Sequence, residues 1–169
     1  MVSQARIVYR VRQFCQTLCA PLRQADVAYA AEHLSPGLLR LFQKMTQAEQ
    51  QHGITLSRAL EAQGHTAPDL LAAALLHDVG KTRYPPRLWE RVLVVLGEHF
   101  APRRAAAWGV GTPRGLRRGF VIRQQHATWG ADLAEGAGAS PRVVALIRQH
   151  HDVPAGDREL AALQAADEG

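Results

Sequence analysis

The residues in this sequence best suited to chemistry are histidines and aspartates that follow apolar helical segments. His77 and Asp78 come directly after Leu70–Leu76. Burying either group without a partner would cost several kcal/mol. A divalent cation held by a neutral imidazole and an ionised carboxylate would offset that cost. A hydrogen bond between the two side chains is the alternative, so this pair alone leaves both a metal site and a structural role open.

Four further candidates follow apolar segments in the same way. They are His126 after Phe120–Ile122, His150 and His151 after Val143–Ile147, and Asp167 after Leu160–Ala166. His52 lies in the middle of a predicted helix, on its apolar side. Helices packed around one core would bring these positions together. The resulting nitrogen and oxygen ligands suit manganese, iron, zinc or nickel, with magnesium as a further option, and suit copper(I) poorly.

Seven candidates exceed the four to six protein and water ligands that one ion usually takes. Two ions that share Asp78 would use them better. Adjacent histidines on a helix point about 100° apart, so His150 and His151 need not serve the same ion. One of them would then orient a ligand instead of binding metal. The sequence leaves the role of His151 open.

Length and composition favour a single domain with a real core. The chain has 169 residues, of which 47% are hydrophobic, and this excludes disorder. No apolar run approaches the ~20 residues of a membrane helix, and the first residues do not resemble a signal peptide. We therefore expect a cytoplasmic protein without a membrane partner. Oligomeric state is open, and a homo-oligomer is compatible with the sequence.

The chain is basic, with a formal net charge of +5, eighteen arginines and two lysines. Arginine suits phosphate geometry, although the same excess fits a compositional habit of the source organism. Nucleic-acid binding is a weak alternative because no aromatic residues interleave with a basic stripe. Its candidate residues are Arg103, Arg104, Arg114, Arg117 and Arg118. Cys15 and Cys19, on one face of a predicted helix, are expected to be reduced packing residues.

The pattern predicts helices throughout and no strands. We expect helices over residues 2–20 and 26–34, a third from Ser35-Pro36 past His52 to Leu60, and the buried helix 70–81 opened by a capping box of Thr66 and Asp69. Further helices are expected over 88–96, over 120–135 with a break near Gly130, over 143–151 and over 157–167. Residues 101–119 read as a long loop or a broken helix. Trp89, Trp108 and Trp129 are expected to be packing residues.

The ordered set of motifs resembles the HD-domain superfamily of metal-dependent phosphohydrolases. His52, then His77-Asp78 within His-Asp-x-Gly-Lys, then a distant Asp167 is similar to the order in that family. The segment His126–Ala131 resembles the His-x-x-x-Gly-Ala of two-metal members, and His150-His151-Asp152 resembles their His-His-Glu/Asp. The resemblance covers about residues 36–169. It implies an all-α helical bundle of the HD-domain type with about seven to nine helices, in which residues 1–34 pack on the metal-binding core as part of one domain spanning residues 1–169.

The resemblance also implies a division of roles. One ion would be bound by His52, His77, Asp78 and Asp167, and a second by Asp78, His126, His150 and, if it is a ligand, His151. Water activated by the metal would attack phosphorus, with Asp78 at the reacting centre. Lys81 would hold a phosphate oxygen, and Arg83 and Arg87 would assist. A cation that complements the end of a helix is the competing role for Lys81.

The sequence departs from the family pattern at three places. The Gly-Tyr-Pro segment of cyclic-dinucleotide phosphodiesterases is absent after His151-Asp152, which argues against a cyclic dinucleotide substrate. Ala48 stands where three-metal members have glutamate, so no third ion is expected. Asp167 lies two residues from the end, where fraying would weaken the first site.

Two functions from different classes follow. The first is hydrolysis of a small phosphomonoester or phosphodiester, nucleotide-like, by one or two metal ions. The second is a non-catalytic regulatory domain that keeps the ligands and senses a phosphorylated molecule. Turnover of a nucleotide panel with manganese would favour the enzyme, and tight phosphate binding without turnover would favour the sensor.

Overall fold

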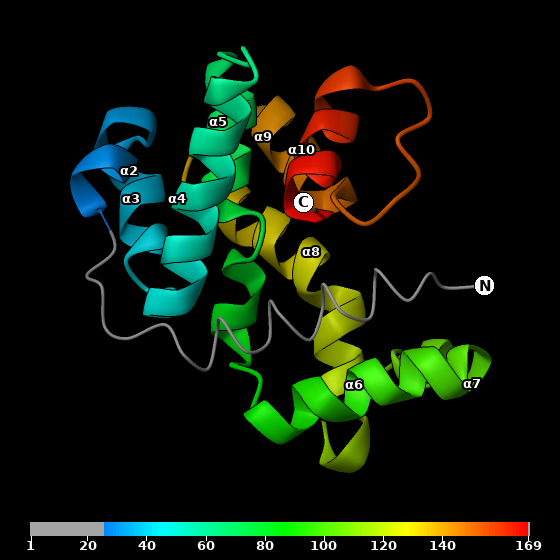
Figure 1. Ribbon diagram of the computed structural model, residues 1–169. Helices are drawn as coiled ribbons and strands as arrows, with labels where there is room; N and C mark the ends of the chain where they lie inside the picture. The colour runs from blue at the N-terminus through cyan, green and yellow to red at the C-terminus, as the bar shows by residue number, and fades with distance from the viewer. Residues whose placement is uncertain (1–25, 169) are drawn as a thin grey trace.

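The structure is a computed structural model that describes residues 26–168. Its α-helices are α2 (Val27–His33), α3 (Pro36–Phe42), α4 (Gln47–Ala62), α5 (Pro68–Leu76), α6 (Leu88–Phe100), α7 (Pro102–Trp108), α8 (Arg118–Gly136), α9 (Pro141–Gln149) and α10 (Arg158–Glu168). There are also two short 3-10 helices, η1 (Val79–Arg83) and η2 (Gly115–Arg117). Residues 26–168 contain no strand. The prediction of an all-α fold is confirmed, and the helix predicted over residues 2–20 lies outside the described residues (Figure 1).

Several helix starts form as the sequence predicts. The hydroxyls of Ser35 and Ser140 accept hydrogen bonds from the backbone N–H groups of Leu38 and Val143, and in both cases a proline occupies the first helical position. Asp157 caps α10 by accepting from the N–H of Leu160. These caps satisfy N–H groups that have no partner within their own helix.

Two predicted helix starts are wrong. The helix expected from Pro36 to Leu60 is two helices, because Thr46 and Glu49 form a capping box that starts α4 after α3 has ended. No such box forms at Thr66, since α5 begins at Pro68 after Ala67, which makes no side-chain cap. The proline at the first position is thus the signal that starts α5.

Two predicted breaks also differ from the structure. The stretch 101–119, expected as a long loop or a broken helix, contains the complete short helix α7 and the turn η2. Helix α8 runs without a break through Gly130, where a break was expected. Gly130 instead allows close packing, because a Cβ at this position would lie 3.1 Å from the amide nitrogen of Gly80 and 3.2 Å from Cγ2 of Ile147.

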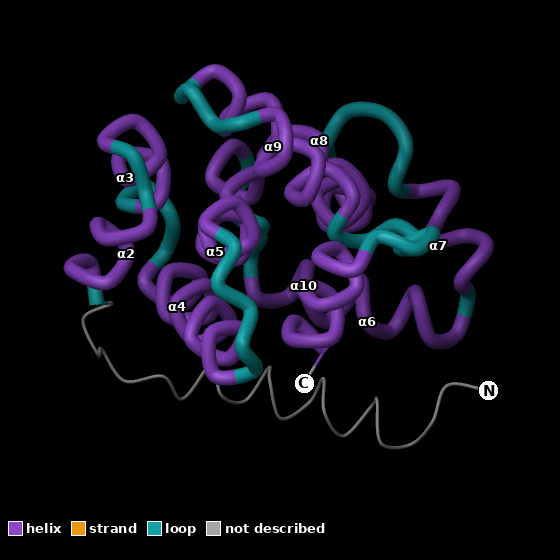
Figure 2. Tube along the Cα trace, turned by 90° about the horizontal axis from the view of Figure 1, so that it is seen from above, coloured by secondary structure: helices purple, strands orange, loops and turns teal. Residues whose placement is uncertain are grey.

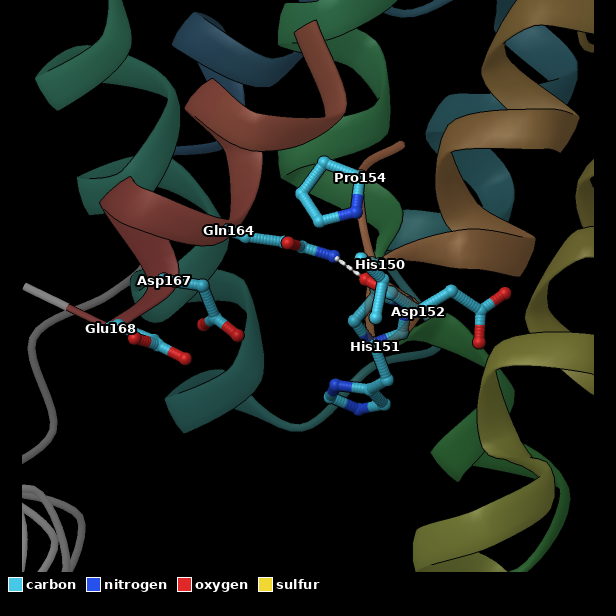
Figure 3. A pocket seen from close by; sticks show the side chains of 8 residues that line it. His150, His151, Asp152, Pro154, Gln164, Asp167 and Glu168 are labelled. Carbon is cyan, nitrogen blue, oxygen red and sulfur yellow. Dashed lines mark hydrogen bonds between the residues drawn. The ribbon is translucent and has the colours of Figure 1, made fainter. Parts of the chain in front are cut away.

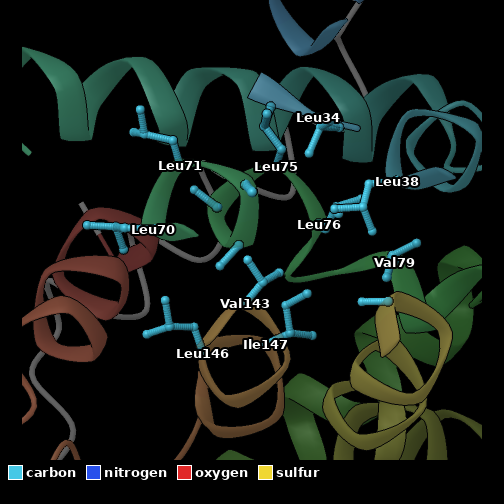
Figure 4. Packing of buried hydrophobic residues seen from close by; sticks show 14 of the residues in the cluster. Leu34, Leu38, Leu70, Leu71, Leu75, Leu76, Val79, Val143, Leu146 and Ile147 are labelled. Atoms are coloured by element: carbon cyan, nitrogen blue, oxygen red, sulfur yellow. The ribbon is translucent and has the colours of Figure 1, made fainter. Parts of the chain in front are cut away.

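Helix α5 is the centre of the main core. Every residue from Leu70 to Leu76 is buried, as expected for a helix that is apolar on all sides. In Figure 4, α5 lies between α9, which contributes Val143, Leu146 and Ile147 to the core, and α4 on the other side. At Gly53 of α4 a Cβ would lie 2.8 Å from the carbonyl oxygen of Leu75, so a glycine permits this approach.

Helices α6 and α7 form a smaller layer apart from this core. They lie together at one end of α8 in Figure 1, and Figure 2 shows them beside α8 on the side away from α2 and α3. A separate cluster of Val94, Ala105 and Phe120 joins them to α8, with Trp108 packed against it. Trp89, expected to pack, is 45% exposed, which corrects that prediction.

Candidate metal centre

The ends of α5 and α9 and the middle of α4 and α8 point their imidazoles at one place. His77 and His150 are the residues that terminate α5 and α9. The ring of His77 lies 5.2 Å from that of His52 and 5.4 Å from that of His150, centroid to centroid. The ring of His126 lies 5.2 Å from that of His150. The structure therefore brings together side chains that lie up to 98 positions apart in the sequence.

The candidate ligand atoms divide into two groups. In each group the atoms lie within 4.8 Å of one another, as ligands of a single ion must. The first group is His52, His77 and Asp167, and the second is His126, His150 and His151. These are the groupings that the sequence predicted, apart from the aspartate that both would share.

Asp78 lies between the two groups. Its Oδ2 is 3.7 Å from Nε2 of His77 in the first group, and its Oδ1 is 3.3 Å from Nε2 of His126 in the second. One carboxylate therefore presents an oxygen to each group. This position suits a bridging ligand between two cations.

Backbone carbonyls fix the orientation of three imidazoles. Nδ1 of His77 lies 2.9 Å from the carbonyl oxygen of Ala74, and Nδ1 of His150 lies 2.7 Å from that of Ile147. These carbonyls belong to the last turns of α5 and α9, where no helical N–H remains to bind them. Because a carbonyl only accepts, each Nδ1 carries the proton and donates it. The lone pair is thus left on Nε2, the atom that faces the centre.

His126 is oriented in the same way from inside a helix. Its Nδ1 lies 3.0 Å from the carbonyl oxygen of Ile122, and burial lowers its pKa despite the nearby carboxylate of Asp78. Burial likewise lowers the pKa of His150 to about 3, helped by the neighbouring His77 and His126. Both rings are therefore neutral at physiological pH, which is the form that binds metal.

One buried nitrogen lacks a partner. Among the described residues, Nε2 of His150 and Oε1 of Glu49 are the buried side-chain atoms without a hydrogen bond. Oε1 of Glu49 still has Nη2 of Arg91 at 3.7 Å. Nε2 of His150 instead faces the other imidazoles, and an unmet acceptor of this kind costs about 1–3 kcal/mol. A bound cation would supply the missing partner, so the donor set fits a metal ion.

The two carboxylates are ionised. Burial raises the pKa of Asp78, but the neighbouring Lys81, His77 and His126 outweigh it and hold that pKa well below its usual range. Burial also opposes ionisation of Asp167, yet the hydrogen bond from His52, with 2.8 Å between Nε2 and Oδ1, lowers its pKa. The same bond outweighs burial at His52 and raises the pKa of that imidazole.

His151 has a second contact that the sequence did not suggest. Nη1 of Arg123 donates to Nε2 of His151 at 2.6 Å, and Nε2 of His126 lies 3.2 Å from the same atom. Withdrawal from water, with the nearby His150 and Arg123, lowers the pKa of His151. Arg123 went unnoticed in the sequence, although it lies one turn before His126 on the same side of α8. Its guanidinium contacts Nε2 of His151, the same atom that the predicted role of His151 as a metal ligand would use.

Lys81 lies beside the shared carboxylate. Its Nζ is 2.5 Å from Oδ2 of Asp78, and its side chain is 24% exposed. It can therefore meet both the carboxylate and a molecule arriving from solvent. Arg83, the other predicted substrate-binding residue, lies over the ring of Trp129 with its Cζ 5.7 Å from the ring centroid. Its role in substrate binding remains a prediction.

Gly80 explains how the His-Asp segment reaches α8. A Cβ at this position would overlap the carbonyl oxygen of His126 and lie 2.6 Å from the amide nitrogen of Gly130. Only glycine lets η1 pack directly on the backbone of α8. This contact places Asp78 and Lys81 beside His126.

A small pocket opens onto both groups of ligands. Its volume is about 280 Å³, and Figure 3 shows the side chains around it. The lining residues are His150, His151, Asp152, Val153, Pro154, Gln164, Asp167 and Glu168. Gln164 fixes one wall by donating from Nε2 to the carbonyl oxygen of Asp152 at 2.6 Å. The pocket gives a small molecule access to His151 and Asp167.

The comparisons with known proteins agree with this geometry. The model of the HD domain family matches residues 51–168, which include all seven candidate ligands. The chain therefore belongs to the HD domain family. Its members bind divalent metals and are largely metal-dependent hydrolases. No curated protein and no solved structure matches the chain, so the family match is the finding on which the assignment depends.

None of the described helices is both long and apolar enough to cross a bilayer.

Proposed function

We propose that this protein is a metal-dependent phosphohydrolase that acts on a small phosphomonoester or phosphodiester, nucleotide-like, with two divalent ions. The observation that carries the proposal is the pair of ligand groups on either side of Asp78. His52, His77 and Asp167 would hold one ion, His126 and His150 the other, and Asp78 both. Bound ions would supply a water of lowered pKa and would polarise the phosphoryl oxygens.

The residues of the chain would do the remaining work. The Nδ1–H bonds to backbone carbonyls aim Nε2 of His77, His126 and His150 at the centre. Lys81 would rotate from Asp78 to an oxygen of the phosphate and stabilise the negative charge that develops in the transition state. The pocket beside His151 and Asp167 would receive the rest of the substrate.

Arg123 offers a second positive charge at the same place. Its guanidinium already lies 2.6 Å from His151, and its Nε is 3.4 Å from Oε1 of Glu98. If His151 turned to an ion, Arg123 would be released toward the substrate, where its planar fork suits phosphate oxygens. His151 would then serve as a ligand only in the loaded protein.

The test is metal analysis combined with turnover. We expect about two ions per purified chain, and hydrolysis of a generic phosphate ester and of members of a nucleotide panel when manganese is added. His77→Ala should remove bound metal and turnover together. His99→Ala, at an exposed position in α6, is the matched control and should change neither. A His77→Ala protein that keeps its full metal content would overturn the assignment.

Lys81 separates metal binding from catalysis. Lys81→Ala should keep the metal and lose about 10²–10³-fold in turnover, the scale of losing one electrostatic contact to the transition state. Lys44→Ala changes the only other lysine, which is exposed on the chain segment after α3, and should be silent. Tight phosphate binding by the metal-loaded protein without turnover of any ester would favour the regulatory domain instead.

A further inference from the structure

Helix α6 carries six of its large apolar side chains on the side that faces away from the molecule, whereas Val94 is buried against α8. Six large apolar residues of this helix are between 39% and 77% exposed. With about 100° between successive residues, they cover one continuous side about 140° wide. We call this side, with His99 included, the α6 face. Its residues are Leu88, Trp89, Val92, Val95, Leu96, His99 and Phe100.

The charged residues of α6 point the other way. Glu90 is buried against α8, where Arg118 Nη1 contacts its Oε2 at 2.6 Å. Arg91 reaches Glu49 of α4, and Glu98 contacts Arg123 of α8. A surface helix normally has the reverse arrangement, with charges outward. A contiguous exposed apolar area of this kind marks a surface that another element covers.

We propose that residues 2–20 of the same chain cover the α6 face. These residues lie outside the described part, and their sequence predicts a helix with one apolar stripe. The stripe falls at the spacing i, i+1, i+4, i+7, i+8 and i+11, with the arginines at positions 6, 10 and 12 on the other sides. Its residues are Ile7, Val8, Val11, Phe14, Cys15 and Leu18. The α6 face has the same period and a similar length.

Helix α4 links the start of the described residues to α6. Asp26, where the described residues begin, is joined to Arg58 of α4 by an ion pair of 2.6 Å. Glu49, nine positions earlier on α4, contacts Arg91 of α6. Nine residues of helix span about 14 Å, and residues 21–25 reach about 17 Å when extended. The extended connection is thus comparable in length to the stretch of α4 between the two ion pairs.

The near edge of the α6 face also borders this route. Arg91, which contacts α4, is three residues after Leu88 and four before Val95, so both lie one helical turn from it. A segment that arrives along α4 thus meets apolar side chains at once. The short connection raises the effective concentration of the segment to the millimolar range, well above a second copy of the chain at micromolar concentration. This favours cover from within the chain.

Disulfide trapping tests the proposal directly. The chain has two cysteines, and Cys15 lies on the predicted stripe. In full-length protein carrying Cys19→Ser, the variants Leu88→Cys, Val92→Cys and Leu96→Cys each add one thiol to the α6 face. Under mild oxidation we expect at least one of them to form a disulfide with Cys15 within a monomer. Val110→Cys, which is exposed outside the face, should not. Disulfide-linked dimers through the introduced thiols, or no intramolecular bond in any variant, would overturn the proposal.

Proteolysis provides a second measurement that needs no cysteine. In the native chain, trypsin should cut slowly after Arg10 and Arg12, because a docked helix protects these bonds. Leu96→Asp should speed this cleavage at least tenfold without changing the helical circular dichroism, since Leu96 is half exposed. Leu116→Asp, at an exposed apolar residue in η2, is the control and should leave the rate unchanged. Equal cleavage rates in the native chain and Leu96→Asp would contradict the proposal, and a dimer dissociated by Leu96→Asp at unchanged cleavage would assign the face to a second copy.

Discussion

The two groups of candidate ligands differ in burial and in charge. In the first, His52 and Asp167 are 32% and 27% exposed and form an ion pair that raises the pKa of the imidazole. In the second, His126 and His150 are buried, and their pKa values are lowered. Protons therefore compete with metal more strongly in the first group than in the second, where burial favours the neutral imidazoles. Two sites that share one aspartate can thus differ in how readily they load.

Replacing the shared aspartate should weaken metal binding in both groups. Asp78→Asn keeps the size of the side chain but removes the charge between them. We expect loss of most bound metal and roughly a 10³-fold loss of turnover, because both ions depend on this carboxylate. Metal content per chain and ester hydrolysis are the measurements. Asp132→Asn, at an exposed residue paired with Arg148, is the control, and metal content equal to that of the native protein would show that Asp78 is not shared.

Adding one methyl group at Gly80 should move Asp78 away from the second group of ligands. In Gly80→Ala the new Cβ would overlap the carbonyl oxygen of His126, so η1 must move away from α8. We expect a loss of about 3 kcal/mol in the free energy of unfolding, in the range of overpacked sites, measured by urea denaturation. Gly136→Ala, where nothing lies within 4 Å of a new Cβ, should be neutral or slightly stabilising. Equal stability of the two variants would show that the close approach at Gly80 is not needed.

Single-ligand variants should distinguish the two groups. Asp167→Ala removes a ligand of the first group only, and His150→Ala a ligand of the second only. Each should lower the affinity of one ion by more than the 10–100-fold that loss of a residue supporting a ligand typically costs, and should leave the other ion bound. Metal content after dialysis against a chelator gives the ions retained per chain. Complete loss of metal in both variants would indicate one common site in place of two.

Acid should affect the groups with opposite sign in the metal-free protein. The folded-state pKa of His150 is about 3, below the ~6.5 of an unfolded chain. As the pH falls below 6.5 the unfolded chain takes up this proton and the folded protein does not, so stability falls by at most about 1.4 kcal/mol per pH unit. His52 has a raised pKa, so its contribution is complete below pH 6.5 and is lost as the pH rises through the folded pKa.

Urea midpoints at pH 7.5 and 5 measure both effects. His150→Gln should lose less stability on acidification than the native protein, and His52→Gln should lose more. Lys44→Gln, at an exposed position after α3, should follow the native protein. The same dependence on pH in all three variants would remove the contrast between the groups.

The sequence predicted which candidate ligands lie together better than it predicted which side of each helix is exposed. Polar residues that follow apolar segments were informative because a buried helix end must lead its next residues toward the core, and the structure brings all seven candidates together. Whether each binds metal remains a prediction. Arg123 could not be found this way. The apolar pattern of α8 does not tell whether an arginine within the helix points toward a site or toward solvent.

The spacing of apolar residues was also insufficient to predict which side of α6 is buried. The residues around Trp89 have the spacing of a core-facing stripe, and the sequence pattern does not tell which side of a helix meets the protein. The structure shows that Glu90, and not Trp89, is on the buried side. The break between α3 and α4 was missed for a related reason, because the apolar pattern continues across it while Thr46 and Glu49 start a new helix.

The hydrogen bonds from Nδ1 to backbone carbonyls have a consequence for sequence variation at the centre. Ala74, Ile122 and Ile147 contribute only their main-chain oxygens to the orientation of the imidazoles. Every amino acid possesses that oxygen, so the aim of the histidines is insensitive to the identity of the residues that steer them. Substitutions at these three positions that preserve the helical turn and the packing should therefore leave the ligands correctly directed. The side chains at these positions can vary together with the core residues around them.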